Sequence, residues 1–388
     1  MRPAKSIYLD HAATTPVDPQ VVEAMLPYFG EQYGNPSSAH RFGRQAENAI
    51  ESAREKIAQL LNCARSEVIF TSCGTESDNL ALRGVAFRAL AEGKRAHLFT
   101  AHTEHHAVSH TAEQLARLNL ARVTWLTPEP DGTLTPEALQ KALGGLASDE
   151  IGLVSVMYAN NEIGTVQPIA ALAEIAHAHG ALFHTDAVQA AGQLSLDVQA
   201  LGVDMLALSA HKFYGPKGVG LLYLRRGVSL YSAQTGGGQE NQRRAGTHNV
   251  PLIVGMARAL ELAYADLPQR VAHYTHLRDR LIDGVLSRVS GAHLSGAEKA
   301  RRLPNHASFT FEGVEANALL MHLDLSGIAA SSGSACNSGN PQPSEVLLAL
   351  GLPPELALGS LRLTVGKQNT DADITYVLMT LPTAIERL

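Results

Sequence analysis

The residues whose types and positions best suit chemistry are a lysine and an aspartate. Each lies just after an apolar, strand-like run. Lys212 comes soon after Met205–Leu208, and Asp186 follows Ala181–Thr185. In an open parallel sheet the ligand binds at the carboxyl ends of the strands, so both side chains are expected at that edge. A lysine delivered there by an apolar strand is unusual, because lysine is rarely buried without a partner. The two residues could form a buried ion pair, or they could both serve a ligand.

A third feature is the turn Thr71–Thr75, which lies between the strand-like Val68–Phe70 and a helical pattern that begins near Glu76. Free backbone N–H groups and hydroxyls at the start of a helix suit a phosphate, although the turn taken alone is also explained by an ordinary helix cap. Pyridoxal phosphate needs a phosphate site, a lysine for a Schiff base and a carboxylate at its pyridinium nitrogen. The residues that supply all three are Lys212, Asp186, Thr75, Ser209 and His211.

Four histidines gather in one short segment, at His102, His105, His106 and His110. Metal binding is one interpretation, because imidazole is a common zinc ligand. No Cys-x-x-Cys pair lies nearby, and Glu104 stands between them without a spacing typical of a metal site. We therefore expect no intrinsic metal. A histidine at this strand end can instead stack on an aromatic cofactor and carry a proton.

Two segments contain arginines that could bind an anion. Residues 236–247 combine four glycines with Arg243 and Arg244, which indicates either an anion-binding loop or a solvated basic turn. Arg362 lies within the strand-like Leu361–Val365. An arginine in an apolar strand often caps a buried carboxylate, and the α-carboxylate of a substrate would fit its bidentate fork.

The three cysteines do not form a disulfide framework in a chain of 388 residues. Cys63 ends the amphipathic helical pattern Phe42–Leu61 and is expected to be packed, and Cys73 beside the phosphate turn could be structural. Cys336 differs, because it lies among small polar residues in Ser331–Ser344, a segment expected to be a mobile loop. An exposed thiol is a liability unless its reactivity is used, so Cys336 is predicted to be a nucleophile that moves toward the cofactor.

The composition narrows the class of protein. The formal net charge is −6 and 45% of the residues are hydrophobic, which favours a globular chain with a large core. The mild acidity argues against nucleic acid and anionic membranes as partners. No run of about 18 apolar residues is present and the N-terminus does not resemble a signal peptide. We expect a cytoplasmic protein.

The elements that must position these residues follow an α/β pattern. Strand-like runs alternate with helical patterns through residue 225, which predicts a mostly parallel sheet covered by helices. After Val250 a helical stretch to about Val289 precedes shorter α and β patterns. We predict a large domain at residues 16–255 and a small α+β domain at residues 1–15 plus 256–388. The predicted strands of the large domain are Val68–Phe70, His97–Thr100, Val123–Leu126, Gly152–Tyr158, Ala181–Thr185, Met205–Leu208 and Gly220–Leu224.

Ordered motifs along almost the whole chain, from Tyr8 to Gly366, resemble one family. They are YLDHAATTP, YGNPSSAH, FTSCGTESDNLAL, TEHHAV, NNEIGTVQPI, HTDAVQAAG, SAHKFYGPKGVG, GGGQE with RRAGTHN, SSGSAC and LRLTVG. The chain resembles the cysteine desulfurases, pyridoxal-phosphate enzymes of the class V aminotransferase group. The resemblance implies a fold type I PLP-dependent transferase, with a large domain and a smaller α+β domain.

The resemblance also implies roles for single residues around pyridoxal phosphate. Lys212 would bind the cofactor covalently, and Asp186 would pair with its pyridine nitrogen. Gln189 would bond its phenolic oxygen, while His105 would stack on the ring and move protons. The residues expected to hold the phosphate are Gly74, Thr75, Ser209 and His211.

Further roles concern the substrate and the partner subunit. Asn161 would contact the cofactor, and together with Arg362 it would orient the substrate carboxylate. Asn35 is an additional candidate for substrate binding. Thr247 would reach the phosphate of a neighbouring subunit, so a homodimer is expected. Cys336 matches the catalytic cysteine of the family.

The implied reaction converts L-cysteine to L-alanine and leaves the sulfur as a persulfide on Cys336. An iron–sulfur scaffold or another sulfur-acceptor protein would then take it, and Cys336 could transiently ligate an iron–sulfur cluster. A selenocysteine lyase would use the same cofactor residues, and a catalytically silent sulfur carrier or scaffold could retain the fold. A dehydrogenase is excluded because no G-x-G-x-x-G opens the first β-α turn.

Overall fold

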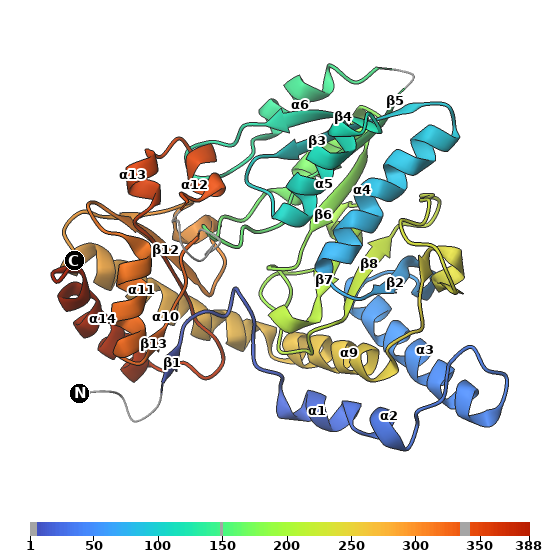
Figure 1. Cartoon of the computed structure of the whole chain (residues 1–388), viewed down its shortest axis with the longest axis horizontal. Helices are drawn as coiled ribbons and strands as arrows, with labels where there is room; N and C mark the ends of the chain where they lie inside the picture. Colours follow the sequence, from blue (N-terminus) through green and yellow to red (C-terminus); the bar gives the residue numbers. More distant parts are fainter. Residues whose placement is uncertain (1–5, 148–149, 334–341) are drawn as a thin grey trace.

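The computed structural model describes residues 6–147, 150–333 and 342–388. Its two main sheets are each covered by helices and have separate hydrophobic clusters (Figure 1). Cys336 lies outside the described residues. No helix in the described part of the chain has the length and hydropathy that a membrane span requires.

The larger sheet has seven strands in the order β2-β8-β7-β6-β5-β3-β4. Its neighbours run parallel except β8, which is antiparallel to both β2 and β7. The predicted mostly parallel sheet is therefore confirmed. The strands are β2 (Val68–Thr71), β3 (Arg95–Ala101), β4 (Ala121–Leu126), β5 (Glu150–Ser155), β6 (Leu182–Asp186), β7 (Met205–Ser209) and β8 (Gly220–Leu224).

Apolar residues occupy both faces of the larger sheet. Successive side chains of a strand point to opposite faces, so neighbouring apolar residues join different hydrophobic clusters. Ile69 joins the cluster beneath α4 and α5, whereas Phe70 joins the cluster with α3, α7 and α9. Leu153 likewise joins the cluster with α4 and α5, and Val154 joins the cluster with α3, α7 and α9. These helices are α3 (Arg41–Leu61), α4 (Gly74–Ala91), α5 (His106–Arg117), α7 (Ile169–Ala178) and α9 (Val250–Ala265), and α6 (Pro136–Leu143) joins the second group.

The smaller sheet is antiparallel, in the order β11-β12-β14. The N-terminal segment packs with it, because Ile7 and Leu9 belong to the same hydrophobic cluster as Phe309 and Leu363 (Figure 1). The predicted domain limits stay a prediction. The elements of this part are β1 (Ile7–Tyr8), α10 (Leu267–Arg288), β11 (Ala292–Leu294), β12 (His306–Phe311), α11 (Ala316–Leu325), β13 (Ile328–Ala329), β14 (Ser360–Thr364) and α14 (Asp371–Ile385).

Two predicted elements differ from the structure. The helical stretch from Val250 is two helices, since α9 ends at Ala265 and α10 starts at Leu267 with Pro268 in its first turn. Proline lacks the N–H of a continuing helix and its ring clashes with the preceding turn. The strand expected to reach Tyr158 ends at Ser155, because the N–H of Met157 bonds the Glu104 carboxylate instead of a strand. The remaining short elements are α1 (Pro19–Met25), α2 (Pro27–Gly30), α8 (Val198–Leu201), β9 (Gly238–Gln239), β10 (Arg244–Ala245), α12 (Glu345–Ala349) and α13 (Pro354–Ala357).

Candidate active site

A cavity of about 300 Å³ lies at the carboxyl ends of β6 and β7. These two strands are adjacent and parallel, so Asp186 at the end of β6 and Lys212 just after β7 reach the same edge. We call this cavity the Lys212 cavity. The predicted site residues that line it are Gly74, Thr75, His105, Asn161, Asp186, Gln189, Ser209, His211, Lys212 and Arg362.

Lys212 donates its Nζ hydrogens to the carbonyl oxygens of Ala12 at 2.6 Å and Ala13 at 2.8 Å. Within the described part of the chain, its ammonium forms no ion pair with Asp186, so the alternative of a simple buried pair is wrong. Burial and the charge of Arg362 together lower the pKa of Lys212 to about 8. An amine with this pKa is partly neutral near physiological pH and can act as a nucleophile.

Asp186 is a buried carboxylate that accepts a hydrogen bond from the backbone of Val188 at 2.9 Å. Burial raises the pKa of Asp186 to about 7, and the nearby Asp78 contributes in the same direction. A cationic N–H partner in the cavity would favour the ionised form. The protonated ring nitrogen of a pyridine is such a partner.

The N-terminus of α4 opens onto the cavity through Gly74 and Thr75. The helix begins at Gly74 rather than near Glu76, and the side chain of its N-cap residue, Cys73, makes no capping hydrogen bond. A Cβ atom at Gly74 would lie 2.9 Å from Cγ2 of Val188, so the close packing requires glycine. The free N–H groups and the helix dipole at this end suit a phosphate.

Arg362 reaches the cavity from β14 of the smaller sheet. Its Nη1 donates to the carbonyl oxygen of Asn161 at 2.9 Å, and its Nη2 donates to the Asp10 carboxylate at 2.9 Å. Its Nε is buried and has no hydrogen-bond partner among the described residues. A carboxylate of a ligand would satisfy this buried donor.

His105 is the N-cap residue of α5, and its Nδ1 accepts a hydrogen bond from the backbone of Ala107 at 3.1 Å. Desolvation lowers the pKa of His105, so the imidazole is neutral at neutral pH. A neutral ring that accepts at Nδ1 carries its hydrogen on Nε2. The ring can therefore stack on a planar ligand and exchange a proton at its edge.

Some residues of the Lys212 cavity were not predicted. The carbonyl groups of Ala12 and Ala13 have no sequence signal, because any residue type supplies a carbonyl. Asp78 is completely buried, lines the cavity, and has Oδ1 3.5 Å from Nε2 of His184. Its spacing of four residues from Gly74 places both on one face of α4, which is a signal that could have identified it.

Two predicted site residues line another cavity, and a third belongs to the part of the chain that the structure does not describe. Asn35 and Thr247 line a different cavity, of about 390 Å³, and not the Lys212 cavity. Cys336 belongs to the segment outside the described residues. The roles of these three residues in substrate binding, in contact with a partner subunit and in catalysis stay predictions.

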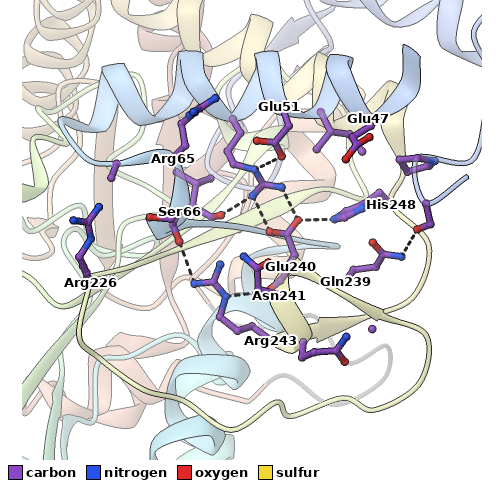
Figure 2. Close-up of a pocket in the computed structure, with 18 residues that line it drawn as sticks. Glu47, Glu51, Arg65, Ser66, Arg226, Gln239, Glu240, Asn241, Arg243 and His248 are labelled. Carbon is purple, nitrogen blue, oxygen red and sulfur yellow. Dashed lines mark hydrogen bonds and ion pairs between the residues drawn. The ribbon is translucent and has the colours of Figure 1, made fainter. Parts of the chain in front are cut away.

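A larger cavity, of about 770 Å³, contains a different set of charges (Figure 2). Arg54 donates to Glu240 at 2.7 Å, and His248 lies 2.5 Å from the other oxygen of Glu240. Figure 2 shows the side chains of Glu240 and His248 pointing toward each other. Arg54 and His248 are thus both bonded to Glu240. The size of a cavity alone therefore does not identify the catalytic site.

The segment 236–247 borders this cavity of about 770 Å³, and its role as an anion-binding loop or a solvated basic turn stays a prediction. Arg243 donates to the carbonyl oxygen of Ser66 at 3.1 Å, and Arg244 donates to Glu76 at 3.0 Å. Both arginines are therefore bonded to protein groups. The contact with Glu76 attaches the segment to the first turn of α4.

Comparison with known proteins explains this geometry. The family model for class V aminotransferases matches residues 7–377. The chain belongs to this family, among its NifS/IscS-type cysteine desulfurases. The cysteine desulfurase IscS of Dictyoglomus turgidum is 48% identical over 384 residues, which cover 99% of this chain and 95% of that protein.

Solved structures agree with this assignment to the cysteine desulfurases. A NifS-like protein superposes with a TM-score of 0.90 at 37% identity, over 99% of this chain and 100% of that one. SspA, solved in complex with cysteine, has a TM-score of 0.79 at 36% identity over 93% and 99% of the two chains. The predicted fold type I architecture and the predicted cysteine desulfurase activity are confirmed. Enzymes of this family depend on pyridoxal phosphate, and the residues of the Lys212 cavity fit that group.

Proposed function

We propose that this cysteine desulfurase binds pyridoxal phosphate in the Lys212 cavity and converts L-cysteine to L-alanine there. The observation that carries the proposal is the meeting of Lys212, Asp186 and the uncapped N-terminus of α4 around one cavity. The bound cofactor supplies an electron sink that labilises bonds of an attached amino acid.

Each part of the cofactor has a partner in the cavity. Lys212 holds it covalently, Asp186 pairs with its ring nitrogen, and Gln189 bonds its phenolic oxygen. His105 covers one face of the ring. The phosphate is held by Gly74, Thr75, Ser209 and His211, all of which line the cavity. Burial and the charge of Lys212 lower the pKa of His211 to about 4, so this ring stays neutral at physiological pH.

The substrate carboxylate is proposed to bind Arg362, whose buried Nε lacks a partner among the described residues, with Asn161 beside it. The solved complex of SspA with cysteine supports L-cysteine as the substrate. Asn35 is a further proposed substrate contact. Lys212, once released from the cofactor, is the group proposed to move the α-proton, because its pKa is lowered to about 8.

Cys336 is proposed to accept the sulfur. Its thiolate attacks the sulfur of the bound cysteine, a new S–S bond forms, and the carbon–sulfur bond breaks with its electron pair staying on carbon. Protonation of that carbon yields alanine, and Cys336 carries the persulfide. An iron–sulfur scaffold or another acceptor protein then removes the sulfane sulfur.

We further propose a cytoplasmic homodimer in which Thr247 reaches the phosphate held by the partner subunit. The cavity that Thr247 lines with Asn35 is separate from the Lys212 cavity, which is compatible with a role toward another chain. Nucleic acid and membranes are not proposed partners.

The test compares wild type with Cys336→Ala and Lys212→Ala. Cys336→Ala should keep the cofactor absorbance and bind cysteine, but should lose alanine formation and the protein-bound persulfide. Lys212→Ala should lose the covalent cofactor. Cys63→Ala is the matched control, because burial raises the pKa of Cys63 to about 12 and keeps that thiol unreactive.

Several outcomes would refute parts of the proposal. Full alanine and persulfide production by Cys336→Ala would exclude Cys336 as the acceptor. Wild-type protein that stays colourless with added pyridoxal phosphate would favour a silent scaffold. Faster turnover of L-selenocysteine than of L-cysteine would favour a selenocysteine lyase.

A further inference from the structure

Outside the Lys212 cavity, three side chains that can ligate a metal converge between α5 and α12. His106 and His110 lie four residues apart on α5, and Glu345 is the first residue of α12. We propose that His106, His110 and Glu345 form a binding site for a divalent transition metal. This proposal revises the expectation of no intrinsic metal, which rested on the lack of a nearby Cys-x-x-Cys pair and on the position of Glu104.

The distances allow one ion to reach all three groups. The ligand atoms of the three side chains lie within 4.8 Å of one another, and Nε2 of His106 is 3.6 Å from Oε2 of Glu345. Two ligand atoms on a tetrahedral zinc with bonds of about 2.1 Å lie roughly 3.4 Å apart. Binding an ion would therefore require these exposed side chains to rotate until their ligand atoms reach that spacing.

Helix α5 places the two imidazoles next to each other. Residues four apart lie on the same helix face, and the rings of His106 and His110 stack with centroids 4.1 Å apart. His102 differs, because its ring stacks on Trp125 at 4.7 Å and it is not part of the cluster. The sequence segment with four histidines is thus divided by the fold into separate roles.

The donor set defines the chemical class of the ion. Two imidazoles and one carboxylate suit zinc, nickel, cobalt or copper, whereas magnesium and calcium prefer oxygen ligands. The side chains of His106 and Glu345 are 52% and 74% exposed. An open set of three protein ligands leaves further positions for water, so the ion is expected to exchange with solvent.

The site would connect two elements beside the candidate active site. α5 begins directly after His105, which lines the Lys212 cavity, and α12 packs through Val346 and Leu347 against Ile163. A metal bound to both helices would link segments that are far apart in the sequence. Because only the folded chain brings the three ligands together, binding should stabilise the fold.

The test is calorimetric titration of Ni²⁺ into the tag-free, pyridoxal-phosphate-loaded protein. We expect one Ni²⁺ per chain. His110→Ala and Glu345→Gln should each bind roughly tenfold more weakly or worse, because losing a direct ligand should cost at least as much as losing an outer-shell partner. His102→Ala is the matched histidine control, and Cys336→Ala excludes a thiol ligand; both should bind as wild type does.

Melting temperature provides a second readout that does not depend on activity. Without metal, the exposed substitutions should melt as wild type does, which shows that they fold. With Ni²⁺, the melting temperature of wild type should rise and that of Glu345→Gln should not. The proposal is wrong if wild type binds no Ni²⁺, if Glu345→Gln or His110→Ala binds as tightly as wild type, or if Cys336→Ala loses binding.

Discussion

Arg362 and Asp10 form an ion pair, with 2.9 Å between Nη2 and Oδ1, although 352 positions separate them in the sequence. The pair joins the N-terminal segment to β14 at the wall of the Lys212 cavity. Asn161 accepts from the other terminal nitrogen of the same guanidinium. Asp10 therefore orients the arginine that is proposed to bind the substrate carboxylate.

Replacing Asp10 by Asn should impair substrate binding more than the chemical step. The guanidinium keeps its charge but loses an ionic anchor, so KM for cysteine should rise about tenfold, equivalent to about 1.4 kcal/mol, with kcat within about twofold. Steady-state alanine production measures both parameters. Asp18→Asn, which removes an ion pair with Lys367 at 3.1 Å, is the control and should leave KM unchanged. A fall in kcat at constant KM would contradict the positioning role.

The capture of pyridoxal phosphate by the apoprotein should depend on pH. Only the neutral amine of Lys212 is nucleophilic, and burial together with Arg362 lowers its pKa to about 8. The rate of appearance of the bound-cofactor absorbance should therefore rise with pH and reach half its maximum near pH 8. Arg362→Gln removes one cause of the lowered pKa, so its midpoint should lie at higher pH. A midpoint unchanged by this substitution would exclude the electrostatic effect of Arg362.

Asp78 should make the protein less stable as the pH rises toward 8. Burial raises the pKa of Asp78 to about 8, so its contribution to stability is fully present below the unfolded pKa of about 4 and is lost progressively as the pH rises through the folded value. Wild type should lose about 1 kcal/mol more than Asp78→Asn between pH 6 and pH 7 in urea unfolding, since the limit between the two pKa values is about 1.4 kcal/mol per pH unit. Parallel stability curves for the two proteins would show that Asp78 does not titrate in this range.

The two carboxylates around Arg54 should differ in their effect on stability. Glu240 is buried and accepts from two nitrogens of Arg54, whereas Glu51 is 47% exposed (Figure 2). Glu240→Gln removes the charge partner of a buried guanidinium and should cost about 3–5 kcal/mol. Glu51→Gln should cost less than about 1 kcal/mol, as exposed pairs do. Equal losses in denaturant unfolding would show that burial does not determine the difference.

Most strands of the larger sheet were predictable because they are short, buried apolar runs bounded by polar or glycine-containing turns. The predicted bounds of the strands at Met205–Ser209 and Gly220–Leu224 agree with the observed bounds to within one residue. The break between α9 and α10 was missed even though Pro268 marks it, because apolar positions continue on both sides. Local periodicity shows where a helix is favoured more clearly than where it ends.

The candidate site was predictable in its residue types and less so in its contacts. Lys212 and Asp186 were placed at one sheet edge from strand ends alone, and the parallel pairing of β6 with β7 brings them there. That Lys212 bonds backbone carbonyls rather than Asp186 depends on where the N-terminal segment packs. Carbonyl groups carry no sequence signal, so this arrangement could not be anticipated.

The sequence by itself determined the chemical inventory, the family motifs and the strands that carry Lys212 and Asp186, because these depend on residue type and short-range order. Only the tertiary structure decided which distant partners meet. Arg362 meets Asp10, and Glu345 approaches His106. Such contacts follow from strand order and from the path of the chain between sheets, and neither is encoded in the local spacing of the residues involved.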